Sequence, residues 1–271
     1  MHTLIVVPAR YGSTRFPGKP LAKINGISMV RRTAQIAINA AKQIKKCDTV
    51  VATDDAFIAE HCEMHGIAYV MTNKTLKTGS DRALAATDIL ASETGKTYNY
   101  VINLQGDAPF TPVSSIVALA ETIKTGADVA TPYIQLSWDG LDGLRKHKIK
   151  TPFSGTTVAV GLDGHAIWFS KNIIPAIRNE KSLRARESLS PINRHIGLYA
   201  YSYDALKRFT SSPENHYEKL EGLEQLRVLE NGMSIACVRV EPPTVTMSGI
   251  DTPADVELAE NLITKHGDPF Q

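Results

Sequence analysis

Residues 3–20 read TLIVVPARYGSTRFPGKP, an apolar run that passes directly into a loop rich in glycine, proline and basic residues. A short, continuous apolar run is typical of a strand buried on both faces, as in a sheet covered by helices. In open α/β sheets, ligands bind beyond the carboxyl ends of the strands, where this loop begins. The stretch therefore predicts an α/β fold with an anion-binding loop after its first strand.

The rest of the first half repeats this alternation of apolar runs and helical patterns. Strands are expected at 48–53, 68–71 and 100–105, and helices at 28–46, 55–66, 80–94 and 112–126. A βαβαβ order of this kind predicts a parallel sheet with helices on both faces, because each parallel connection needs a crossover helix.

The pattern changes after about residue 130. Short strand-like runs follow one another there without long helices, and the polar stretch 141–155 reads as a loop. We expect one domain over residues 1–271, with an inserted mixed-β region at 130–202. Further elements are expected as a short helix at 203–209, helices at 219–231 and 252–265, and a strand at 234–240.

Bulk composition excludes several classes of protein. The formal net charge of the 271 residues is only +2, which gives no argument for a nucleic-acid partner. No apolar run approaches the roughly 18 residues of a membrane-spanning helix, so no membrane partner is expected. The three cysteines are far apart in sequence and form no CxxC pair, which is typical of reduced thiols in a cytoplasmic protein.

The loop after the first strand has the residues that an anion site needs. Gly12 and Gly18 allow backbone N–H groups to approach an anion closely, and Arg10 and Lys19 supply charge-assisted hydrogen bonds to phosphate oxygens. The spacing differs from that of a Walker A loop, because Pro20 stands where Ser or Thr would hold magnesium. A nucleoside triphosphate is the expected ligand, and the alternative is a basic surface loop without one.

Two acidic motifs are candidates for the missing metal ligands. Asp107, in QGDAP, directly follows the strand at 100–105, where a carboxylate is placed to hold Mg²⁺ against phosphates. Asp251, in GIDTPADVE, precedes Thr252, which is a natural N-cap for the following helix. Taken singly, each aspartate also fits an ordinary turn residue before a helix.

Polar residues at three other places are further candidates for binding. They are Ser80 and Arg82 at a helix start, His195 and Tyr199 in the run RHIGLY, and Glu224 and Gln225 in LEGLEQLRVLENG. Ser80 also fits a plain N-cap, and Glu224 and Gln225 also fit a solvated helix face. If RHIGLY is one strand, His195 and Tyr199 face the same side of it, although a lone histidine is more often structural.

Together these motifs resemble one family, the 3-deoxy-manno-octulosonate cytidylyltransferases or CMP-Kdo synthetases, in which Kdo is an eight-carbon ulosonic acid. The resemblance extends over about residues 3–262. The motifs that carry it, in family order, are PARYGSTRFPGKPL, VATDD, TGSDR, NLQGDAP, FS with a basic residue, RHIGLYAY, LEQLRVLENG and GIDTPADVE.

The resemblance implies a fold, a reaction and partners. The family fold is a Rossmann-like α/β nucleotidyltransferase with a mostly parallel sheet and a smaller mixed-β region that forms a homodimer. The family joins CTP and Kdo to give CMP-Kdo and pyrophosphate, with Mg²⁺ as cofactor, in lipopolysaccharide biosynthesis. The anomeric hydroxyl would attack the α-phosphorus in line, a reaction that depends on positioning and on neutralising charge.

The resemblance also assigns roles to the candidate residues. Arg10 and Lys19 would be catalytic and hold the triphosphate; Ser13, Ser80, Arg82 and Gln105 would contact the nucleotide; Asp107 and Asp251 would hold Mg²⁺; and Lys171, His195, Tyr199, Glu224 and Gln225 would line the sugar site.

Three departures from the family pattern concern the acceptor. Ala108 replaces a usual Glu, Lys171 replaces an Arg, and SGTTVAV at 154–160 replaces the segment NPNxVKVV. Lys cannot make the two-pronged contact that Arg makes to a carboxylate. The acceptor is therefore expected to be Kdo or its 8-amino-8-deoxy form. The alternatives are another ulosonic acid, such as a sialic acid, and a sensor that binds the nucleotide without turnover.

Overall fold

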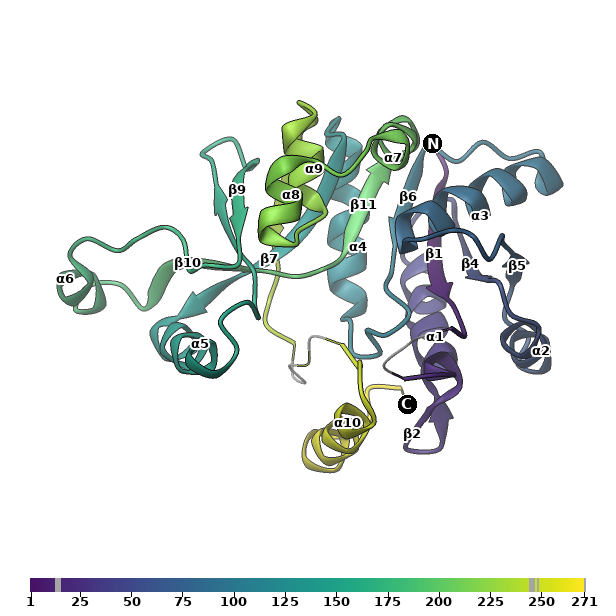
Figure 1. Ribbon diagram of the computed structural model, residues 1–271, viewed down its shortest axis with the longest axis horizontal. Helices are drawn as coiled ribbons and strands as arrows, with labels where there is room; N and C mark the ends of the chain where they lie inside the picture. The colour runs from purple at the N-terminus through teal and green to yellow at the C-terminus, as the bar shows by residue number, and fades with distance from the viewer. Residues whose placement is uncertain (13–15, 244–246, 248, 271) are drawn as a thin grey trace.

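The computed structural model describes residues 1–12, 16–243, 247 and 249–270, which form one ten-stranded sheet, a two-stranded hairpin and surrounding helices (Figure 1). The strands are β1 Thr3–Ala9, β2 Lys23–Ile24, β3 Ile27–Ser28, β4 Cys47–Thr53, β5 Tyr69–Met71, β6 Tyr100–Asn103, β7 Val129–Ser137, β8 Thr157–Val160, β9 Ala166–Ser170, β10 Leu189–His195, β11 Tyr199–Ser202 and β12 Ile235–Arg239. The α-helices are α1 Met29–Ala41, α2 Ala56–Met64, α3 Gly79–Thr94, α4 Val113–Thr122, α5 Trp138–Lys150, α6 Glu180–Arg184, α7 Tyr203–Ser211, α8 His216–Glu221, α9 Gln225–Glu230 and α10 Pro253–His266.

The sheet is mixed, with a parallel part and an antiparallel part. Its order is β5-β4-β1-β6-β11-β7-β10-β8-β9, and β12 pairs with β7. The strands β5, β4, β1 and β6 are parallel, as their order in the sequence predicts. From β11 onward the pairs along this order are antiparallel, and only β12 pairs with β7 in parallel. The expected mostly parallel sheet is therefore restricted to the first half, and the α/β nucleotidyltransferase fold has a mixed sheet.

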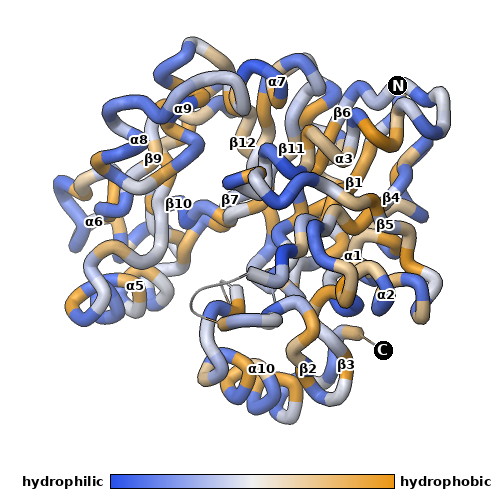
Figure 2. The backbone as a smooth tube through the Cα atoms, turned by 45° about the vertical axis from the view of Figure 1, so that its right-hand side comes forward, coloured by the Kyte–Doolittle hydropathy of each residue, from blue (hydrophilic) through white to orange (hydrophobic). Residues whose placement is uncertain are grey.

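Helices cover both faces of the parallel part of the sheet. Successive side chains of β1 point to opposite faces, so each face packs against its own set of helices. Ile5 and Val7 pack with α1, α2 and α4, whereas Leu4 and Val6 pack with α3, α7 and α9. Figure 2 shows hydrophobic residues concentrated along β1 and β6, in the middle of the molecule. Buried on both faces, these strands read as continuous apolar runs in the sequence.

One predicted loop is a helix. The stretch 141–155 was expected to be a loop, but most of it belongs to α5, Trp138–Lys150. Ser137 caps this helix, and three apolar side chains on one face of it are buried, namely Trp138, Leu141 and Leu144. The two glycines and the high charge of the stretch conceal this short apolar stripe, so packing overrides local propensity there.

The helix expected at 219–231 is interrupted. Gly222 adopts a left-handed conformation (φ 61°) that ends α8, and α9 begins at Gln225. A left-handed glycine is a common helix terminator, and here it turns the chain so that residues 223–225 face the interior cavities described below.

A small unit beside the sheet carries the C-terminal helix. The hairpin β2–β3 and α10 share a hydrophobic cluster with Met29, Phe110 and Ile250 that is separate from the two sheet cores. Figure 1 shows α10 beside β2, apart from the main sheet. In the described part of the chain, no helix is long and apolar enough to cross a membrane.

Candidate active site

Two adjoining cavities open at the carboxyl ends of the parallel strands. Cavity A, of about 470 Å³, is lined by residues that follow β1 and β6, by the start of α3, and by Glu224 and Asp251. Cavity B, of about 740 Å³, is lined by α5, by residues 194–199 and by α10. Leu223 and Gln225 line cavity B, whereas Glu224 between them lines cavity A. Gly249 lines cavity B, and Asp251 lines cavity A. The two cavities therefore belong to one cleft.

The sheet topology brings the first loop and the QGDAP motif together. The strands β1 and β6 are parallel neighbours, so the residues that follow them emerge at the same edge. Gly106 is required at this point, because a Cβ atom there would lie 2.3 Å from the carbonyl oxygen of Pro8. The close approach places Asp107 against the loop that carries Arg10 and Lys19.

The two aspartates predicted to hold a metal converge on one cation. The Lys19 ammonium lies 2.7 Å from Asp107 Oδ2 and 3.2 Å from Asp251 Oδ1. A hydrogen bond from Ile250 N–H to the carbonyl of Asp107 (3.0 Å) fixes the second chain beside the first. Residues 144 positions apart thus form one acidic pair. Among the described residues, no group of three or more His, Cys, Asp and Glu side chains could hold a metal by itself.

The N-terminus of α3 faces cavity A. Its N-cap is Thr78, which forms a capping box with Asp81, so the suggestion that Ser80 caps this helix is wrong. Ser80 lies one residue inside the helix, is buried, and accepts a hydrogen bond from Asn103 Nδ2 (3.4 Å). Backbone N–H groups at a helix start, together with the helix dipole, favour an anion there.

Arg82 borders cavity A but is held from behind. Its guanidinium is buried, donates to Asp54 Oδ2 (2.8 Å) and also donates to the hydroxyl of Thr72. Asp54 belongs to the VATDD motif, to which the sequence reasoning gave no role. A carboxylate directly after β4, at the same edge as the anion loop, was the available signal. The pair fixes Arg82 in place at the cavity wall.

Arg10 and Gln105 also line cavity A, as their positions after β1 and β6 predict. Ser13 lies outside the described residues. Glu224 was expected at the sugar site but lines cavity A, at the boundary with cavity B. Its carboxyl is open to the cleft but surrounded by protein, and this desolvation raises its pKa.

In cavity B, His195 and Tyr199 are neighbours for a reason that the sequence did not predict. His195 ends β10 and Tyr199 begins β11, so they belong to two strands, with ring centroids 5.5 Å apart. The His195 ring also contacts Phe169, and its Nε2 lies 2.8 Å from the Thr131 hydroxyl. Burial lowers the pKa of His195 to about 3 and raises that of Tyr199, so both are neutral at pH 7.

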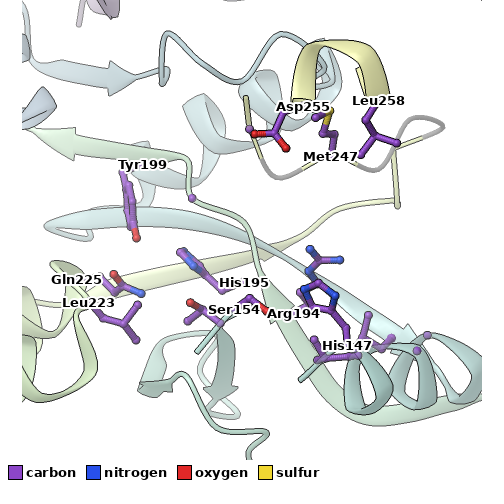
Figure 3. A pocket seen from close by; sticks show the side chains of 18 residues that line it. His147, Ser154, Arg194, His195, Tyr199, Leu223, Gln225, Met247, Asp255 and Leu258 are labelled. Carbon is purple, nitrogen blue, oxygen red and sulfur yellow. The ribbon is translucent and has the colours of Figure 1, made fainter. Parts of the chain in front are cut away.

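Cavity B contains polar groups that lack protein partners. Gln225 is 4% exposed, and its Nε2 has no hydrogen-bond partner among the described residues. Figure 3 shows Gln225, Leu223 and Tyr199 at one end of the cavity, with Asp255, Met247 and Leu258 on the opposite wall. A buried donor without a partner costs free energy, which a polar ligand would recover.

Arg194 is a cavity residue that sequence reasoning missed. It lines cavity B, and no hydrogen bond or ion pair to its guanidinium occurs among the described residues. Burial lowers its pKa, which marks a poorly solvated charge. Its neighbour His195 was singled out instead, although the basic residue of RHIGLY was a signal for an anionic ligand.

Lys171, predicted to contact the sugar, does not line either cavity. Its backbone N–H donates to Glu221 Oε2 (2.7 Å), and its carbonyl accepts from Lys148 Nζ. After burial, the positive charge of Lys171 is a second cause that lowers the pKa of His195. Of the other departures, residues 154–156 line cavity B, whereas Ala108 borders a small adjoining cavity with Gln105 and Arg194.

Comparison with known proteins identifies the family of this chain. The family model for cytidylyltransferases matches residues 4–235. The 3-deoxy-manno-octulosonate cytidylyltransferase of Maricaulis maris is 38% identical over 270 residues, with 99% of each chain covered. That of Thermodesulfovibrio yellowstonii is 37% identical, with 98% of this chain and 100% of the relative covered.

A solved structure is also similar over almost the whole chain. It is a CMP:2-keto-3-deoxy-manno-octonic acid synthetase in complex with CTP, 29% identical, with a TM-score of 0.79, and the match covers 98% of this chain and 99% of that one. The chain therefore belongs to the cytidylyltransferases and, within them, to the 3-deoxy-manno-octulosonate cytidylyltransferase (CMP-Kdo synthetase) family of nucleotidyltransferases.

Proposed function

We propose that this chain transfers the cytidylyl group of CTP to the anomeric hydroxyl of Kdo, giving CMP-Kdo and pyrophosphate for lipopolysaccharide biosynthesis. Family membership supports the reaction, and the joined cavities A and B support its two substrates. The oxygen of the anomeric hydroxyl forms a bond to the α-phosphorus, the bond from that phosphorus to the bridging oxygen breaks, and pyrophosphate leaves from the opposite side.

Cavity A is proposed to bind CTP. Arg10, Lys19 and the N-terminus of α3 place positive charge around one space, which suits a triphosphate. Arg82 is kept in place by Asp54 and supplies a fixed cation at the wall. Ser80 lies beneath this wall, and the roles of Ser13, Ser80 and Gln105 in binding the nucleotide stay predictions.

Asp107 and Asp251 are proposed to hold Mg²⁺ together with the phosphates of CTP. The fit rests on the Lys19 ammonium, which occupies the point between their oxygens and so marks a place where a cation is stabilised. Mg²⁺ in phosphate sites is usually held by one or two carboxylates plus substrate oxygens, which this pair matches. When bound, the ion would neutralise phosphate charge and polarise the phosphate group under attack. Lys19 would then turn to the phosphates.

Cavity B is proposed to bind the acceptor sugar. Tyr199, the neutral His195 and the unpartnered amide of Gln225 offer hydrogen bonds to sugar hydroxyls. Arg194 offers an unpaired positive charge to the acceptor's carboxylate. Glu224, at the boundary of the two cavities, would meet the sugar near the reacting phosphate.

The charge of cavity B does not by itself separate Kdo from its 8-amino form. Among the described residues, Arg194 has no anionic partner, and the carboxylate of Asp255 on the opposite wall already accepts three hydrogen bonds at its own helix start. Arg194 suits the carboxylate that both acids carry, and Glu224, at the boundary of the two cavities, offers a carboxylate to an ammonium. Lys171 lines neither cavity, so replacing Arg by Lys at that position does not by itself create a site for an amine.

The single observation that carries the proposal is the convergence of Lys19, Asp107 and Asp251 in cavity A, beside an acceptor cavity with unpartnered polar groups. A nucleotide sensor has no need of both acidic groups or of the second cavity. A sialic acid remains the alternative acceptor, because it too is an ulosonic acid with a carboxylate.

We also propose that the chain forms a homodimer through its mixed-β region. Four large apolar side chains there are exposed to solvent, namely Ile149, Phe153, Leu162 and Ile167. A second subunit that covers these side chains would remove them from water. The three free thiols suit a reducing compartment such as the cytoplasm, where the reaction is proposed to occur.

The acceptor is tested by competition between sugars. The protein is incubated with CTP and Mg²⁺ and with Kdo, 8-amino-8-deoxy-Kdo or N-acetylneuraminate, and kcat/KM is measured by pyrophosphate release. We expect the highest value with Kdo. A higher value for the amino sugar would transfer the assignment to that acid, and CTP binding without turnover on any acid would support the sensor.

A further inference from the structure

Helix α10, whose first turn follows Asp251, is held to the rest of the molecule by few elements. It packs through Ala259 and Ile263 on the small cluster formed with the hairpin β2–β3, outside the two sheet cores. Its principal contacts with another element are those with β2. The Glu260 carboxylate of α10 also accepts a hydrogen bond from Asn25 N–H in the hairpin turn (2.8 Å), so the hairpin holds the middle of the helix.

The far end of α10 is fixed by a buried ion pair. Asp268, two residues beyond the helix, accepts hydrogen bonds from Arg32 at 2.7 and 2.9 Å in a two-pronged arrangement. The side chains are 1% and 8% exposed. The Arg32 guanidinium also donates twice to the carbonyl of Ile24 in β2, at 2.7 and 3.1 Å. The pair therefore joins α1, the hairpin and the C-terminal segment at one point.

An aromatic side chain covers this junction. The ring centroid of Phe270 lies 5.2 Å from the Arg32 guanidinium and 5.7 Å from that of Arg31. Phe270 N–H donates to Asp268 Oδ1 (3.1 Å), and the Arg32 contact lowers the pKa of Asp268. We call Arg32, Asp268 and Phe270 the C-terminal clasp.

The clasp and Asp251 lie at opposite ends of one rigid element. A helix of 14 residues is about 21 Å long, and Asp251 precedes its first residue by two positions. The near end is tied through Ile250 to the carbonyl of Asp107, and the Asp251 carboxylate contacts Lys19. A small tilt about the hydrophobic cluster would thus move Asp251 relative to Asp107.

We propose that Arg32 and Asp268 are positioning residues that set the separation of the Asp251 and Asp107 carboxylates. This rests on the proposed function, in which that carboxylate pair holds the metal. The two residues touch neither substrate and act only through the orientation of α10. The family motifs quoted above end near residue 262, so Asp268 lies beyond the last of them.

The test measures metal binding directly. Mn²⁺ binding to the full chain with CTP is followed by electron paramagnetic resonance, without any sugar, for the wild type and Asp268→Asn. We expect the Kd for Mn²⁺ to rise about tenfold in the variant. The Mg²⁺ concentration for half-maximal pyrophosphate release should rise equally, whereas KM for Kdo should change less than twofold. Asp268→Glu should restore part of the affinity.

Two further variants separate positioning from general effects. Glu257→Gln removes a charge from an exposed position on the same helix, nearer to Asp251, and should leave the Kd unchanged. Phe270→Ala leaves the ion pair in place and should give a smaller rise than Asp268→Asn. CTP binding in EDTA reports whether each variant retains an intact cavity A.

The outcomes distinguish the clasp from the reaction itself. The clasp proposal would be overturned by an unchanged Mn²⁺ Kd in Asp268→Asn. It would also be overturned if KM for Kdo and the Kd for CTP in EDTA rose as much as the Mn²⁺ Kd. If the wild type releases no pyrophosphate from CTP with any ulosonic acid, the proposed function fails instead. The Mn²⁺ measurement would still decide whether the clasp sets the carboxylate pair.

Discussion

Cavities A and B differ in how their charges are compensated. In cavity A two of the cations are paired within the protein: Lys19 with Asp107 and Asp251, and Arg82 with Asp54. In cavity B the described part of the chain provides no partner for the Gln225 amide nitrogen or the Arg194 guanidinium. In cavity A, carboxylates hold these two cations before any ligand binds. Cavity B has polar groups that only a ligand can pair.

The difference indicates separate tasks for the two cavities, namely phosphoryl transfer in cavity A and acceptor binding in cavity B. Positive charge held close to the phosphates stabilises the transition state of phosphoryl-type transfer, which is the task of cavity A. Unsatisfied polar groups reduce folding stability but give discrimination, because a sugar that cannot pair with them binds poorly. Changes in cavity A should therefore affect turnover, and changes in cavity B should affect acceptor binding.

The largest effect is expected for Asp107→Asn. The loss of one metal carboxylate should lower kcat for pyrophosphate release by about 10³-fold, since a metal supplies several kcal/mol of charge stabilisation. CTP binding in EDTA should persist. Asp163→Asn, at a surface position whose side chain is 72% exposed, is the matched control and should retain full turnover. A kcat for Asp107→Asn within tenfold of wild type would remove Asp107 from the catalytic apparatus.

Lys19→Met should lower kcat by about 10²-fold, because a fixed cation at the phosphates is lost. The same change should tighten Mn²⁺ binding in the absence of CTP, because it removes the ammonium that lies between the two carboxylates. Both quantities are measured against Lys23→Met, an exposed lysine four residues along the chain. Weaker Mn²⁺ binding in Lys19→Met would show that the lysine does not compete for the cation position.

Gln225→Leu should raise KM for Kdo about tenfold and leave KM for CTP unchanged, since a hydrogen bond to the acceptor is lost. The free energy of unfolding should stay equal or rise by up to about 1 kcal/mol, because a buried donor without a partner is removed. Steady-state kinetics and urea denaturation check the two parts, with the exposed Gln43→Leu as control. A fall in stability would mean that Gln225 has a structural partner in solution.

The smallest expected effect concerns stability and not turnover. It falls in the pH range in which His195 titrates in the unfolded chain. Its pKa is about 3 when folded and about 6.5 when unfolded, so between these values the unfolded chain binds one more proton. Stability is therefore lost as pH falls through that window. His195→Gln should reduce the slope of unfolding free energy against pH by about 1.4 kcal/mol per unit there. The exposed His216→Gln should change it much less, and equal slopes in the two variants would refute burial of a neutral His195.

The parallel half of the fold could be predicted from the sequence because its signals are local. The run TLIVV is apolar throughout because β1 is buried on both faces, and Gly106 stands where β6 meets Pro8. Since parallel neighbours end at the same edge, the placement of Arg10, Lys19 and Asp107 in one cavity followed from the strand order.

The rest depended on long-range packing that leaves little local trace. Helix α5 was taken for a loop because its apolar stripe is short and interrupted by two glycines. His195 and Tyr199 were assigned to one strand, but the chain turns between them. Arg194 lines cavity B and Lys171 does not. The fold of the mixed sheet decides which of the two basic residues reaches the cavity, and no spacing in the sequence contains that information.

The central claim is that the two cavities form one active site, and ³¹P NMR of the wild-type protein with CTP, Kdo and Mg²⁺ tests it most directly. The account predicts that CTP signals are replaced by one phosphodiester and one equivalent of pyrophosphate, and that neither forms when Kdo or Mg²⁺ is omitted. Loss of CTP to free CMP without a sugar phosphodiester, or unchanged CTP despite binding, would contradict the account.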